Sequence, residues 1–144
     1  MSDERKTLLE VKDLKVSFFT PAGEVKAVDG ISYTLKEHEV MGIVGESGSG
    51  KSVESYAIMG LLQSPGKVVG GSITFDGDDL LAYDEEQMRD FRGNKASMIF
   101  QNPMTCLNPV YTIGNQLMEA LPCHDKDYPK EKARERAIEM LELV

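Results

Sequence analysis

The sequence has no tryptophan, only two cysteines and no long apolar run. A membrane-spanning helix needs roughly 20 consecutive apolar residues, whereas even the apolar stretch Tyr56–Leu62 is soon interrupted. The cysteines, Cys106 and Cys123, form no Cys-x-x-Cys pair. We therefore expect free thiols in a reducing compartment rather than a disulfide framework or a zinc site.

Positive charge is also scarce, because 16 lysines and arginines face 24 aspartates and glutamates and the net charge is −8. This balance argues against non-specific binding to nucleic acid or to an anionic membrane surface. A phosphate ligand would have to be held by local geometry. The chain is otherwise ordinary, with 41% hydrophobic and 28% charged residues, and its length allows one compact core.

The first third of the sequence predicts a β-hairpin and then a strand–loop–helix unit. Apolar residues alternate over 9–18 and 25–35 around the turn Thr20–Gly23, which favours two antiparallel strands. The short apolar run Val40–Val44 is typical of a strand buried on both faces of a parallel sheet. A helix is expected from Lys51 to about Leu62, stopped by Ser64-Pro65-Gly66.

The remaining sequence predicts short mixed elements followed by helices. The expected elements are a strand Gly70–Phe75 with the turn Asp76-Gly77, a helix from Asp84 to about Phe91, a strand Ala96–Phe100, a helix Thr112–Leu121, a loop Pro122–Tyr128 and a helix from Pro129 onward. Asp84 and Gln87 have the spacing of a capping box. The last helix has one apolar face made of Ala133, Ala137, Met140, Leu141 and Val144.

One glycine-rich loop fits the phosphate-binding pattern G-x-x-x-x-G-K-[ST] at every fixed position. Its residues are Gly45, Glu46, Ser47, Gly48, Ser49, Gly50, Lys51 and Ser52. Glycines let several backbone N–H groups converge on a phosphate, and the following helix adds its unpaired N-terminal donors and the positive end of its dipole. Lys51 would reach the β- and γ-phosphates, and the Ser52 hydroxyl would bind Mg²⁺.

A second stretch narrows the nucleotide-binding class. Met98–Pro109, with the sequence MIFQNPMTCLNP, resembles the Q-loop region of ATP-binding cassette (ABC) ATPases. The form is that of subunits which drive dipeptide, oligopeptide and nickel importers. The resemblance continues through IMGLL, VGGSITFDGDDLL, FRGNKASMIFQ and KARERAIEMLELV, so it covers essentially the whole chain.

The resemblance implies an α/β fold, the ABC-type cassette of the P-loop NTPases. Residues 1–144 would form part of the ATP-binding domain, with an N-terminal antiparallel β subdomain and part of the RecA-like core over 1–100. The Q-loop and the start of the helical subdomain would occupy 101–144. The LSGGQ signature, the Walker B strand and the switch histidine of the family are absent from these residues. We therefore expect a C-terminally incomplete domain, either the N-terminal part of a longer polypeptide or a truncated product, whose phosphate-loop strand lacks a central neighbour.

The resemblance also assigns roles to single residues. Gln101 matches the Q-loop glutamine, which in the family approaches Mg²⁺ and the attacking water, so Lys51 and Gln101 are the candidate catalytic residues and Ser52 and Gln101 the candidate metal ligands. Adenine stacks on an aromatic residue of the N-terminal sheet in this family. Phe18 fits its spacing, although Phe19 would suit stacking equally well.

The implied function is that of an ATPase subunit, in which ATP and Mg²⁺ binding and hydrolysis power peptide import. The implied partners are a second cassette, identical or not, the membrane permease subunits through the Q-loop region, and indirectly a substrate-binding protein. The subunit would lie peripherally at the cytoplasmic face of the cell membrane and bind no nucleic acid.

Two alternative functions are a soluble ABC-class ATPase and a catalytically inactive nucleotide-binding fragment. The 144-residue chain alone is expected to be inactive, because each hydrolytic site needs donors from two cassettes and the signature and Walker B parts are absent from these residues.

Overall fold

The computed structural model describes residues 5–102, 106–121, 123 and 127–144. The chain divides into two compact units, Met1–Arg89 and Asp90–Val144. The first unit carries the predicted phosphate-binding loop, and the second carries Gln101 and the C-terminal helices.

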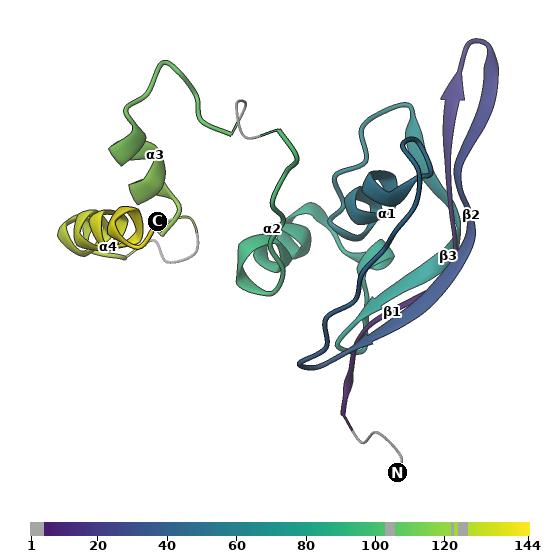
Figure 1. Ribbon diagram of the computed structural model, residues 1–144, viewed down its shortest axis with the longest axis horizontal. Helices are drawn as coiled ribbons and strands as arrows, with labels where there is room; N and C mark the ends of the chain where they lie inside the picture. The colour runs from purple at the N-terminus through teal and green to yellow at the C-terminus, as the bar shows by residue number, and fades with distance from the viewer. Residues whose placement is uncertain (1–4, 103–105, 122, 124–126) are drawn as a thin grey trace. The chain divides into compact units, whose positions relative to one another are not determined.

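The first unit is built on one four-stranded antiparallel sheet with the strand order β2-β1-β3-β4 (Figure 1). Its strands are β1 (Thr7–Thr20), β2 (Gly23–Lys36), β3 (Gly66–Phe75) and β4 (Asp78–Asp79). The predicted hairpin is confirmed, since β1 and β2 pair across the turn that joins Thr20 to Gly23. The predicted strand before the Asp76-Gly77 turn is also confirmed, and it begins four residues earlier than expected, at Gly66.

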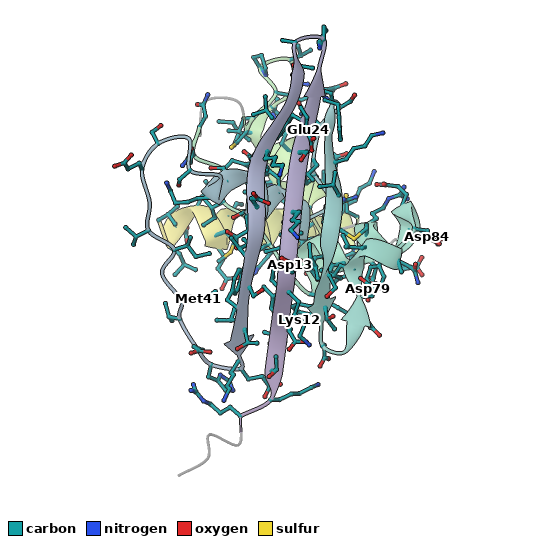
Figure 2. All side chains as sticks on the ribbon, turned by 90° about the vertical axis from the view of Figure 1, so that its right-hand side faces the viewer. Lys12, Asp13, Glu24, Met41, Asp79 and Asp84 are labelled. Carbon is teal, nitrogen blue, oxygen red and sulfur yellow. The ribbon has the colours of Figure 1, made fainter. Side chains whose placement is uncertain are left out.

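Helix α1 (Lys51–Ile58) lies against one face of this sheet (Figure 1). Buried apolar side chains of the sheet make up much of the core of the first unit: Val11, Leu14, Val16, Val28 and Ile73. Figure 2 looks onto the opposite face, where Lys12 and Asp13 lie on the central strand β1. The apolar alternation of β1 thus separates a core face from a charged outer face, as a half-buried sheet requires.

Two predicted strands are absent, and both predictions are wrong for the same physical reason. Val40–Val44 has no regular structure, with Val40 99% exposed, and Figure 2 shows Met41 on a stretch of coil outside the sheet. Ala96–Phe100 makes only an isolated bridge between Arg92 and Ala96. A doubly buried strand needs a hydrogen-bonded neighbour on each side. Among the described residues no strand pairs with either run.

The short helices begin where predicted, but α1 ends early. It stops at Ile58 rather than near Leu62, because Gly60 takes a left-handed φ of 62° before the predicted stop is reached. A 3₁₀ turn, η1 (Leu80–Ala82), then leads to α2 (Glu85–Asn94).

The capping box of α2 is confirmed by two reciprocal hydrogen bonds. The Asp84 N–H donates to Gln87 Oε1 at 2.9 Å, and the Gln87 N–H donates to Asp84 Oδ1 at 2.8 Å. The helix is regular to Phe91, since Arg92 and Gly93 leave helical geometry. The predicted end near Phe91 is therefore confirmed.

The C-terminal part of the second unit contains α3 (Ile113–Glu119) and α4 (Lys130–Glu142). Thr112 caps α3 by accepting a hydrogen bond from the Asn115 N–H at 3.3 Å. Both helices were expected, and Ala133 and Ala137 of α4 are buried. The other members of its predicted apolar face are exposed: Met140, Leu141 and Val144.

The predicted loop Pro122–Tyr128 is described only in part, because Pro122 and residues 124–126 lie outside the described residues. Cys106 and Cys123 are free and exposed, in agreement with the expectation of free thiols. Within the described ranges, no helix is both long and apolar enough to cross a membrane.

The core position Leu14 offers a test of the sheet. Its side chain on β1 is fully buried, so Leu14→Ala should lower the free energy of unfolding by about 2–5 kcal/mol. Val25→Ala on β2 is the control, because Val25 is 56% exposed and its truncation should cost less than about 1 kcal/mol. Urea unfolding followed by circular dichroism measures both. Equal losses in the two variants would contradict the burial pattern.

Candidate phosphate-binding site

The loop 45–50 leads directly into α1, whose first residue is Lys51. Gly48 and Gly50 have φ values of 82° and 94°, which residues other than glycine rarely adopt. No side chain caps α1 at Gly50. The first backbone N–H groups of an α-helix have no intrahelical partner, so this exposed loop presents uncapped donors and the positive end of the helix dipole together.

The ammonium group of Lys51 is held by its own loop. Its Nζ donates to the carbonyl oxygens of Gly45 at 2.6 Å and Glu46 at 2.7 Å, and to the Ser49 hydroxyl at 3.2 Å. The Ser49 N–H in turn donates to the Glu46 carbonyl at 3.2 Å. Because a lysine has three N–H donors, all of them are engaged within the loop. The positive charge therefore lies at the centre of the loop, where an incoming anion would compete for these donors.

Close approach to backbone requires glycine at Gly50, the end of the loop, but not at Gly45. A Cβ on Gly45 would lie 2.7 Å from Ser49 Oγ, a flexible neighbour. A Cβ on Gly50 would lie 2.3 Å from the Ala27 carbonyl oxygen of β2, which is backbone and cannot turn aside. The register of β1 with β2 passes from Val16–Val28 to Ser17–Lys26, so Ala27 is the extra residue of a β-bulge. The start of α1 is seated on this bulge.

Glu54 and Tyr33 are contacts of α1 that sequence reasoning did not identify. Glu54, three residues after Lys51, is only 4% exposed, and its Oε1 has no hydrogen-bond partner among the described residues. Tyr33 of β2 is half-buried, and its pKa is raised by burial first and then by its hydrogen bond to the Glu54 carboxylate. The spacing of Glu54 from Ala57 and Ile58 on one helix face was the available signal for its burial.

The other predicted site residues, Phe18 and Gln101, lie outside the phosphate loop. Phe18 is half-buried on β1, opposite Val25 on β2 and Gly66 on β3. A Cβ on Gly66 would come within 2.8 Å of the Phe18 ring, so the ring packs on that glycine. Phe19 is 48% exposed. Gln101 is exposed in the second unit, in the segment between α2 and α3.

In the part of the chain that the structure describes, no three histidine, cysteine, aspartate or glutamate side chains come together as a metal-binding group. A site that uses one hydroxyl and the oxygens of a phosphate ligand is compatible with this arrangement, because Mg²⁺ keeps several waters and takes few protein ligands.

A glycine-rich loop that closes around a lysine and opens a helix defines a phosphate-binding protein of the P-loop class. The family model described as "ABC transporter" matches residues 28–144. The chain therefore belongs to the ABC transporter family.

Curated relatives narrow the similarity to peptide transport. The chain is 50% identical over 139 residues to the oligopeptide transport ATP-binding protein AppD of Bacillus subtilis. This match covers 96% of the chain and 42% of AppD. It is also 50% identical over 137 residues to the dipeptide transport ATP-binding protein DppD of Escherichia coli, covering 95% of the chain and 42% of DppD. The chain thus spans less than half the length of these relatives.

Solved structures show the same fold. The dimeric ATP-binding cassette MJ0796, solved in a post-hydrolysis state bound to ADP and Pi, matches with a TM-score of 0.80 and 24% sequence identity. The match covers 94% of the chain and 56% of that cassette. The fold of the described residues is accordingly part of an ABC cassette, which confirms the predicted fold class.

Two glycines of the loop allow a matched test of the close contact between the start of α1 and the backbone of β2. Both Gly48 and Gly50 have positive φ, but only Gly50 faces backbone, since a Cβ on Gly48 meets nothing within 4 Å. Gly48→Ala should therefore cost only the strain of a left-handed residue, about 1–2 kcal/mol. Gly50→Ala adds a clash with Ala27 and should cost roughly 1–3 kcal/mol more. Equal unfolding free energies of the two variants in urea would refute the close contact.

Proposed function

We propose that this chain binds the phosphates of ATP through the loop Gly45–Ser52. The observation that carries the proposal is the cluster around Lys51, where one ammonium and an uncapped helix start share an exposed glycine loop. A phosphate would take donors from the backbone of Gly48–Ser52. It would exchange at least one oxygen partner of Lys51 for its own, because all three lysine donors are already in use.

Mg²⁺ would join the site together with the nucleotide. When bound, the ion neutralises charge on the β- and γ-phosphates. Ser52, the second residue of α1, is the proposed hydroxyl ligand, and Gln101 is the proposed second ligand, supported by the similarity to peptide-transport ATP-binding proteins. Lys51 and Gln101 are the proposed catalytic residues. Phe18 is the proposed adenine platform, with Phe19, the more exposed ring, as the alternative.

We further propose that the protein drives peptide import as the ATPase subunit of an ABC transporter. Support comes from the names of its relatives, which are oligopeptide and dipeptide transport ATP-binding proteins. The cassette MJ0796 is dimeric, which supports a second cassette as partner. The other proposed partners are permease subunits, contacted through the Q-loop region, and indirectly a substrate-binding protein. The protein would lie peripherally on the cytoplasmic face of the membrane.

The proposed domain layout has two parts. The β subdomain and phosphate loop would occupy 1–100, and the Q-loop with the start of the helical subdomain would occupy 101–144.

Lys51→Ala should abolish ATP binding by the full chain, because the substitution removes the charge at the centre of the phosphate loop. Isothermal titration with ATP and Mg²⁺ measures the effect. Lys12→Ala is the matched control, since Lys12 lies on the outer face of the sheet with its side chain 65% exposed (Figure 2) and its loss should leave the affinity unchanged. Native affinity in Lys51→Ala would sink the assignment of the loop.

The 144-residue chain by itself should bind ATP without hydrolysing it. Its sequence contains no LSGGQ string and no apolar strand ending in Asp-Glu after Gln101, so the donors that stabilise the transition state from a partner cassette are missing. A phosphate-release assay tests this expectation, with Lys51→Ala as the background. Turnover of about 1 s⁻¹, ordinary for an enzyme, that is lost in Lys51→Ala would contradict this expectation.

A further inference from the structure

We propose that Glu54 is a positioning residue for the phosphate loop, which acts by anchoring α1 to Tyr33 on β2. The inference rests on the proposed nucleotide binding at Gly45–Ser52 and deepens it. Glu54 would affect the affinity for nucleotide by placing the helix, without contacting a phosphate itself.

The burial of Glu54 is the first observation. Acidic side chains are almost never fully buried unless they are paired, yet Glu54 is 4% exposed with Oε1 unpartnered among the described residues. Its backbone N–H donates to the Gly50 carbonyl at 3.0 Å, which closes the first turn of α1. The buried carboxylate and the glycine that ends the loop therefore belong to the same helical turn.

The place of Tyr33 on the sheet is the second observation. Tyr33 pairs with Val11 of β1, and Val11 pairs with Ile73 of β3. Directly opposed residues of an antiparallel sheet point to the same face, and Val11 and Ile73 are both buried. Tyr33 thus belongs to the core face that α1 covers (Figure 1). Burial raises the pKa of Tyr33, and a hydrogen bond to the Glu54 carboxylate raises this pKa further.

Two residues of β2 contact the first turn of α1. Ala27 meets Gly50 through backbone, and Tyr33 meets Glu54 through side chains. Two contacts that are separated along the strand prevent the helix start from pivoting about the bulge. The uncapped N–H groups between them, at Lys51–Val53, are the groups that must converge on a phosphate. Precise placement of such donors sets the strength of anion binding.

The negative charge of Glu54 lets nucleotide affinity distinguish a positioning role from a purely structural one. Burying a carboxylate that has few partners costs free energy. The carboxylate also repels phosphate through space. If Glu54 were only a structural residue, Glu54→Leu would therefore leave nucleotide affinity unchanged or raise it. The positioning role predicts the opposite direction, because the leucine cannot accept the hydrogen bond of Tyr33.

The test compares four variants of the full chain by titration with ATP and Mg²⁺ and by thermal unfolding. Glu54→Leu and Tyr33→Phe should each weaken binding about tenfold, the usual effect of losing a hydrogen bond to a charged group. Thermal unfolding checks that each variant is folded. Glu54→Gln keeps an acceptor for Tyr33 and should restore native or tighter binding. The double variant Tyr33→Phe/Glu54→Leu should bind no more weakly than either single variant.

The outcomes separate this inference from the proposed function. Lys51→Ala serves as the reference: if it binds ATP normally, the proposed function itself fails. If Lys51→Ala abolishes binding while Glu54→Leu and Tyr33→Phe bind normally, only the positioning role is overturned. Additive losses in the double variant, or a Glu54→Gln variant as weak as Glu54→Leu, also overturn it. Should Glu54→Leu fail to fold, Tyr33→Phe decides alone, because it removes one hydroxyl and keeps the ring.

Discussion

The close approach of Gly50 to the Ala27 carbonyl is the constraint on which the site depends. A hypothetical Cβ at position 50 would lie 2.3 Å from that oxygen, so the helix start can occupy this place only with glycine there. The β-bulge at Ala27 and the left-handed φ of Gly50 are two halves of one junction. Through it, an otherwise plain antiparallel sheet orients the first turn of α1 and the lysine that follows.

The phosphate loop places a positive charge in an acidic chain. The chain as a whole is acidic, and anions are repelled by such a surface at long range. At the loop, the Lys51 ammonium lies among the oxygens of Gly45, Glu46 and Ser49 and beside uncapped N–H groups. Local geometry therefore supplies a small positive site within a negative protein. The carboxylate of Glu54 is buried on the same helix, and burial and then a hydrogen bond to this carboxylate raise the pKa of Tyr33.

Sequence patterns predicted the elements that are determined locally. The hairpin of β1 and β2, the capping box of Asp84 and Gln87 and the start of α1 at Lys51 all depend on neighbours close in the chain. The runs Val40–Val44 and Ala96–Phe100 were expected to be strands and are not. An apolar run becomes a strand only when another strand supplies hydrogen bonds, and that condition cannot be read from the run itself.

The same distinction applies to the site. The loop pattern predicted the residues around Lys51, since the spacing of its glycines carries the geometry. Ala27 and Tyr33 could not be predicted, because their positions depend on a bulge and on the register of β2 against β1. Glu54 was recognisable only through its helical spacing from Ala57 and Ile58, and its partner lies on a different element.

The backbone amides of the loop provide the most direct test of the central claim that Gly45–Ser52 holds the phosphates of ATP. Amide chemical shifts of the ¹⁵N-labelled chain would be recorded by NMR as ATP and Mg²⁺ are added. We expect the largest saturable shifts at Gly48–Ser52, where the uncapped donors of α1 lie. Saturable shifts elsewhere with these amides unmoved, or no shifts at all, would contradict it.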